Sequence, residues 1–214
     1  MRSAFRLVIP TLLSCSLGAC GGGGGGGTGT PQATKLVLPL SFPFSGSMFP
    51  FGSFTQPTTG VLVVGDQYYI DDDYATRCFL SFELAPVPPG ATIETAQIRM
   101  LGRVSTADDP YALMGFLKAS HVDLGPAITL DDFDSGIPYT VPSIPAFPAG
   151  SAYGEQTFSV LESVRDDLQV GRPRTTLRLR FEAAPQKDGK SEQVEILVNP
   201  VNAAQRPVLE ITYR

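Results

Sequence analysis

The chain has 214 residues, of which 43% are hydrophobic and 17% charged, and its formal net charge is −5. This composition indicates a globular protein rather than a disordered one, and the length allows one domain with a sizeable core. The acidic balance argues against a nucleic-acid partner, because such a surface neutralises phosphates with a basic stripe.

The N-terminus has the layout of a lipoprotein signal peptide. Arg2 and Arg6 precede an apolar run, Leu7–Leu17, that is too short to span a membrane as a helix. The run ends in Leu17-Gly18-Ala19-Cys20, which resembles the bacterial lipobox. The resemblance implies that residues 1–19 are removed and that Cys20 is acylated, so that its lipid chains hold the protein to a bilayer.

Residues 20–33 form a linker between this anchor and a domain at residues 34–214. The glycine run Gly21–Gly27 has no side chain that could pack, so we expect a flexible leash. In the lipoprotein pattern, an aspartate directly after the cysteine favours retention in the inner membrane. Gly21 stands at that position, and the resemblance therefore implies delivery to the outer membrane of the cell envelope, on its periplasmic or its exposed side.

Alternating apolar and polar residues predict short β-strands along the domain. Lys35–Phe42 fits an edge strand because a proline interrupts it, and Gly60–Gly65 fits a buried strand. The clearest pair is Arg77–Leu84 and Thr95–Met100, joined by a proline-rich corner. Later strands are predicted at Thr175–Phe181, Val194–Val198 and Pro207–Tyr213, with a straight or bent strand at Tyr111–Val122.

One helix is predicted, within Gln156–Gly171, because Phe158, Leu161, Val164 and Leu168 are spaced to share one buried face. Asp188-Gly189 suits a tight hairpin turn, since both residues tolerate positive φ angles. The fold class that follows is all-β: an antiparallel β-sandwich of jelly-roll type with one short helix across one end.

Two long connections separate these elements. Ser41–Gly60 is rich in phenylalanine, so it either folds over the sheet or forms an exposed contact surface. Thr129–Gly150 is rich in aspartate, proline and glycine.

Several of these segments together resemble the DNRLRE domain, a bacterial extracellular β-sandwich related to carbohydrate-binding modules. The resemblance spans Lys35–Arg214 and rests on Val63-Val64-Gly65, on Arg77, Leu80 and Phe82, on Pro88–Ile93 and on Ala96–Met100. Its later counterparts are Phe158–Val160, the short helix Ser163–Val170, the strand Thr176–Phe181 and the terminal Arg206–Tyr213. The chain departs from the family pattern in having no tryptophan and a phenylalanine-rich loop.

The resemblance implies a non-catalytic binding or adhesion module, with polysaccharide as its ligand. Without tryptophan, other aromatic rings must hold the faces of the sugar rings. We expect this role at Phe49, Phe51, Phe54, Tyr68 and Tyr69. The alternative is a structural or assembly lipoprotein that binds an envelope protein through the phenylalanine-rich loop. A polysaccharide lyase or hydrolase would need two carboxylates or a His-Tyr pair that converge in a groove.

Acidic clusters at residues 71–73, 108–109 and 131–134 offer oxygen ligands for a hard cation. Sandwich domains related to carbohydrate-binding modules often hold a structural Ca²⁺, and the candidate ligands are Asp131, Asp132 and Asp134. Read as an EF-hand, the loop from Asp132 fails, because Ser143 stands where an acid is required.

His121 is the only histidine, and on a strand its side chain would share a face with Asp123. Neither a Gly-x-Ser-x-Gly motif nor a second histidine supports catalysis, so we expect no enzyme activity. Cys78 is the only cysteine after Cys20, and its pattern predicts a small buried residue of the core.

Overall fold

Antiparallel strands are the main regular structure of the described residues. The computed structural model describes residues 32–214 except 57–59, 70–71, 135–139, 142, 186 and 200–201, and the predicted signal peptide, Cys20 and the glycine run lie outside these residues. Gln32–Arg214 form a unit with its own core, so we expect this unit to fold by itself.

The described strands are β1 (Thr34–Pro39), β2 (Gly46–Met48), β3 (Phe54–Thr55), β4 (Val61–Tyr69), β5 (Asp72–Glu83), β6 (Ile93–Val104), β7 (Leu117–His121), β8 (Thr140–Val141), β9 (Gly154–Ser159), β10 (Arg174–Phe181), β11 (Glu192–Leu197) and β12 (Val208–Tyr213). The helices are α1 (Pro110–Met114), α2 (Asp131–Asp134) and α3 (Leu161–Gln169), with 3-10 turns η1 (Phe42–Phe44) and η2 (Ala203–Gln205).

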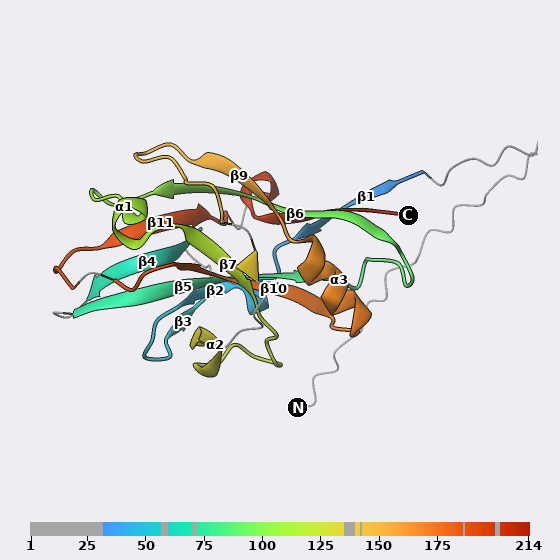
Figure 1. Ribbon diagram of the computed structural model, residues 1–214, viewed down its shortest axis with the longest axis horizontal. Helices are drawn as coiled ribbons and strands as arrows, with labels where there is room; N and C mark the ends of the chain where they lie inside the picture. Colours follow the sequence, from blue (N-terminus) through green and yellow to red (C-terminus); the bar gives the residue numbers. More distant parts are fainter. Residues whose placement is uncertain are drawn as a thin grey trace, which may run out of the picture. The chain divides into compact units, whose positions relative to one another are not determined.

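The strands form two layers joined by one hairpin (Figure 1). In the first layer β6 pairs with β9 along one edge and with β12 and then β11 along the other. On the far side of these two strands, β12 pairs with β1, and β11 pairs with β4. In the second layer the order is β3-β2-β5-β10-β7-β8. The hairpin of β4 and β5 connects the layers. The predicted all-β antiparallel sandwich is therefore confirmed.

The core lies between the layers and follows the predicted alternation. Cys78, Leu80 and Phe82 of β5 are fully buried there, and burial raises the pKa of the Cys78 thiol far above its usual range. Phe79 points to the opposite side of β5, but it is buried as well, because a second cluster covers it. That cluster contains Met48, Val122, Leu124 and Phe133, with Phe54 packed against it.

The helix α3 lies across one end of the sandwich and contacts β6 of one layer and β10 of the other (Figure 1). Val164 is its fully buried apolar residue. Arg165 donates to the carbonyl oxygen of Ile93 at 2.7 and 3.2 Å, which fastens the helix to the start of β6. The predicted short helix is present, and it closes this end of the core.

Two predicted boundaries are wrong. The helix begins at Leu161 rather than Gln156, because Phe158 is paired opposite Ile98 as part of β9. Residues 111–114 belong to α1 instead of a strand, because Pro110 occupies the first turn and Asp109 accepts a hydrogen bond from the Tyr111 amide at 2.9 Å.

Two other strands are longer than predicted. The β4–β5 pairing extends to Tyr69 and Asp72, and β6 continues past Met100 to Val104. Gly102 in this extension leaves room for the Phe147 ring, which a Cβ atom would approach to 2.8 Å. Periodicity alone does not show such pairing, since the partner strands lie far away in the sequence.

Gly65 is required in β4 by both its backbone and its neighbours. Its φ is +137°, and a Cβ atom there would lie 2.2 Å from the Glu192 carbonyl oxygen. We predict that Gly65→Ala lowers the free energy of unfolding by about 2 kcal/mol or more in urea denaturation. The control is Gly52→Ala, which also has a positive φ but open space around the new Cβ atom, and it should cost only about 1 kcal/mol. Equal losses in the two variants would contradict the steric argument.

Candidate functional site

The connections opposite α3 meet at one end of the sandwich, which we call the loop end (Figure 1). Three contacts hold them together. Lys187 Nζ lies 2.9 Å from Asp72 Oδ1, the Gly189 amide donates to Asp73 Oδ2 at 2.9 Å, and Lys190 Nζ lies 2.9 Å from Asp108 Oδ2. The β4–β5 hairpin, the β10–β11 connection and the segment after β6 therefore form one surface.

An aromatic group stands on one side of this end. The rings of Phe49 and Phe51 stack with centroids 5.3 Å apart, and Phe51 meets Tyr74 edge to face at 5.4 Å. Tyr69 is paired with Asp72, and Tyr74 follows Asp72 by two positions along β5. Tyr69 and Tyr74 therefore lie on the same side of the hairpin. Phe51 and Tyr69 are 54% and 52% exposed, so their rings are open to a ligand.

The structure thus brings Phe49 and Phe51 together with Tyr74, and it places Tyr69 on the same side of the hairpin as Tyr74. Phe54 packs instead against the buried cluster around Phe79. Tyr68 points to the other side of the hairpin, near Gly189. The sequence pattern does not single out Tyr74, because Phe51, the ring it contacts, belongs to a different hairpin. Only the alternation of Tyr74 with Asp72 is visible in the sequence.

A cavity of about 280 Å³ adjoins β4 and β5, where Gly65 and the consecutive residues Ala75, Thr76 and Arg77 line it. Arg77, Arg180 and residues 181–185 line it together with Thr76. The Thr76 hydroxyl and the Arg180 Nε are buried atoms without a hydrogen-bond partner. These two groups can donate hydrogen bonds to a polar group inside the cavity, whose lining includes none of the residues of the aromatic group.

The carboxylates of Asp131, Asp132 and Asp134 have different surroundings and do not form one ligand set here. Asp132 accepts hydrogen bonds from the amide and the hydroxyl of Thr129 at 2.7 and 2.9 Å. Asp134 Oδ1 lies 2.6 Å from a guanidinium nitrogen of Arg77. The Arg77 guanidinium in turn lies 3.9 Å from the centre of the Phe133 ring. Asp131 is exposed.

Buried Arg178 holds this short helix in place. It donates to the carbonyl oxygens of Asp132 and Phe133 at 2.9 and 3.0 Å. Burial, with smaller contributions from Arg77 and Arg180, lowers the pKa of Arg178 to about 10. The helix α2 thus serves as a cover over the outer side of β5.

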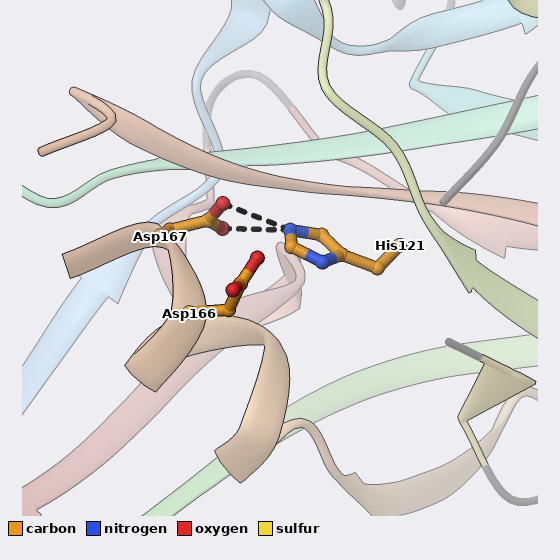
Figure 2. A group of neighbouring side chains, drawn as sticks. All are labelled: His121, Asp166 and Asp167. Atoms are coloured by element: carbon orange, nitrogen blue, oxygen red, sulfur yellow. Dashed lines mark hydrogen bonds and ion pairs between the residues drawn. The ribbon is translucent and has the colours of Figure 1, made fainter. Parts of the chain in front are cut away.

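His121 pairs with Asp167 rather than with Asp123 (Figure 2). Its Nε2 lies 2.9 Å from both carboxylate oxygens of Asp167, and both side chains are at most 1% exposed. Asp123 lies beyond the end of β7, so the expected alternation with His121 no longer applies. Asp167 was missed, although it follows the buried Val164 by three positions and therefore faces the core.

Arg172 completes this network. It contacts Asp123, Asp166 and Asp167 at 2.9 Å each. Burial lowers its pKa, but the three carboxylates outweigh burial and raise the pKa of Arg172 far above its usual value. The cation also stands beyond the C-terminus of α3, where two acidic side chains would otherwise oppose the helix dipole.

The His121 network is better suited to holding α3 than to catalysis. His121, Asp166 and Asp167 place ligand atoms within 4.8 Å of one another, the arrangement of a metal site. Arg172, however, already occupies oxygens of both aspartates. Since His121 and Asp167 are sealed from solvent, a substrate cannot reach them in this arrangement.

Further acidic residues gather on the other side of the β4–β5 hairpin. Asp66 is fully buried, and its burial, together with Asp73, Glu192 and Asp188, raises the pKa of its carboxyl to about 7. Burial also raises the pKa of Glu192, with Asp188, Asp108 and Asp73 adding to the effect. Two of the three acidic clusters seen in the sequence, around residues 72–73 and 108, therefore meet at the loop end.

The chain matches no known family model, and a comparison with curated proteins likewise finds no match. The likeness to the DNRLRE domain therefore stays a prediction from the residues quoted above. Within the part of the chain that the structure describes, no helix is long and apolar enough to cross a membrane.

The buried pair of His121 and Asp167 yields a prediction about stability. We expect His121→Ala to lower the free energy of unfolding by about 2 kcal/mol or more, because the buried Asp167 carboxylate loses one of its two hydrogen-bonding partners and keeps only Arg172. Asp123→Asn at the exposed end of the network should cost less than about 1 kcal/mol. Urea denaturation of both variants checks this, and an unchanged midpoint for His121→Ala would contradict the role of the pair.

Proposed function

We propose that the protein is a lipid-anchored lipoprotein of the bacterial cell envelope whose β-sandwich is a non-catalytic binding module for polysaccharide. The aromatic group at the loop end is the observation that carries the binding part of this proposal. Exposed rings hold the faces of sugar rings by stacking and by burying apolar C–H surface. The likeness of the chain to carbohydrate-binding sandwiches supports the same ligand class.

The surroundings of the aromatic group suit a sugar polymer. Phe51 and Tyr69 are open rings, and the pair of Asp72 and Lys187 at their edge supplies both an acceptor and a donor. The cavity lined by Thr76 and Arg180 has further buried donors next to β5. Sugar hydroxyls need such a combination, because a purely apolar pocket would leave them without partners.

The anchor part of the proposal rests on the residues before the domain. Cys20 ends a lipobox-like sequence, and acyl chains on its sulfur would tether the sandwich through the linker at residues 20–33. Gly21 favours the outer membrane as the destination.

The binding site can be tested on the Gln32–Arg214 unit with an array of bacterial and plant polysaccharides. We expect saturable binding that becomes about tenfold weaker or more when Phe51 or Tyr69 is replaced by alanine, because each ring contributes stacking energy. Phe116→Ala is the matched control: this ring is 61% exposed, does not belong to the aromatic group, and its loss should leave binding unchanged.

An array without any bound glycan would shift the proposal to the alternative, an envelope protein as partner. Crosslinking in the envelope would then identify that partner, and Phe51→Ala would be expected to abolish the crosslink. Binding of a glycan that survives both alanine substitutions would move the site away from the aromatic group.

The anchor is tested in the full chain expressed in a bacterial host. We predict that Cys20→Ser abolishes incorporation of a labelled fatty acid and releases the protein from the membrane fraction, because the acylated sulfur is lost. Cys15→Ser, within the predicted signal peptide, should leave both unchanged. Labelling that persists in Cys20→Ser would show that the lipobox assignment is wrong.

A further inference from the structure

Three buried carboxylates face one another across neighbouring strands at the loop end. Asp66 of β4 stands directly opposite Glu192 of β11 in the register, and opposite Ala75 of β5 on its other side. Asp73 lies two positions from Ala75 and so on the same side of the hairpin as Asp66. Asp66, Glu192 and Asp73 are only 0%, 1% and 7% exposed.

The oxygens of these carboxylates are largely without partners. Both oxygens of Asp66, Oδ1 of Asp73 and Oε1 of Glu192 are buried and accept no hydrogen bond of ordinary geometry. The amide of Gln67 is the one backbone donor that favours the ionised form of Asp66. Asp73 Oδ2 accepts from the Gly189 amide at 2.9 Å. Buried polar atoms are rarely left in this condition, so a missing partner has to be sought.

The charges around the group do not supply that partner. Asp188 and Asp108 add negative charge, and Lys190, which favours ionised Glu192, is 61% exposed and already paired with Asp108 at 2.9 Å. Like charges directly opposite each other destabilise a sheet, and a buried charge without a counter-ion is costly. Only a bound cation or added protons would remove this excess.

We propose that Asp66, Asp73 and Glu192 form a binding site for Ca²⁺. Calcium takes six to eight oxygen ligands, tolerates irregular geometry and accepts carboxylates, backbone carbonyls and water. A depression of about 300 Å³ lies nearby, and three of its lining residues, Asp108, Asp188 and Lys190, act electrostatically on Glu192. The bound ion would fasten the β4–β5 hairpin to β11.

This site differs from the compact group of His121, Asp166 and Asp167. The ligand atoms of that group lie within 4.8 Å of one another, whereas Asp66, Asp73 and Glu192 do not form such a compact group and would have to close onto the ion. The charge of these three carboxylates, however, is not matched by an arginine, whereas Arg172 matches that of the His121 group. The cation site also stands apart from the polysaccharide proposal, since it lies on the opposite side of the β4–β5 hairpin from Tyr69 and Tyr74.

The test is calorimetric titration of the chelator-treated Gln32–Arg214 unit with Ca²⁺ at about pH 8, together with thermal unfolding with and without about 2 mM Ca²⁺. We expect one binding event with a Kd of about 10⁻⁴ M or tighter and a rise in Tm of about 4 °C or more. Asp66→Asn and Glu192→Gln should each abolish the binding and the rise in Tm. Asp131→Asn, an exposed acid of α2, should retain both.

A second readout separates a lost ligand from a damaged fold. In chelator, Asp66→Asn should unfold at a higher temperature than the unsubstituted protein, because the repulsion with Glu192 is relieved, and with Ca²⁺ the order should reverse. The proposal is overturned if the unsubstituted protein neither binds Ca²⁺ nor gains stability from it, or if binding persists in both Asp66→Asn and Glu192→Gln. Loss of binding in Asp131→Asn would overturn it as well, because the ion would then lie at α2.

Discussion

The whole arrangement depends on the long strand β5, which belongs to both layers of the sandwich. Its first half pairs with β4 in one layer, and its second half pairs with β10 and β2 in the other. A strand of this kind must be buried on both sides where the layers meet, and Phe79 and Leu80, on opposite sides, are both fully buried. Because β5 starts at the loop end, the same strand that carries the core also places Asp73 and Tyr74 there.

The two ends of the sandwich differ in whether their buried carboxylates have partners. At the α3 end, His121 and Arg172 supply partners for Asp166 and Asp167, so the network is closed and stabilises the helix against the sheet. At the loop end, oxygens of Asp66, Asp73 and Glu192 remain without partners. A matched charge network holds a structure together, whereas an unmatched one calls for a ligand. This contrast is the physical reason for proposing a cation site at the loop end rather than at the α3 end.

The two sides of the β4–β5 hairpin divide the proposed roles between them. Tyr69 and Tyr74 lie on the side of the aromatic group, and Asp66 and Asp73 lie on the other. An ion bound behind the hairpin would hold the strands that present the rings, without itself touching a ligand on them. Structural cations in extracytoplasmic modules commonly act in this way, since millimolar affinity suffices where the ion is plentiful.

The sequence by itself determined the all-β class, the burial of Cys78, Leu80 and Phe82, and the presence of a short helix, because each depends on the alternation or spacing of residues close in the chain. It also contains the lipobox-like Leu17–Cys20, and it indicated most of the residues of the aromatic group. Only the tertiary structure decided that His121 meets Asp167, that Phe51 meets Tyr74, and that Asp66 faces Glu192. These pairs come from strands, a helix and hairpins 23 to 126 positions apart by residue number, and local periodicity carries no information about which distant segments will lie side by side.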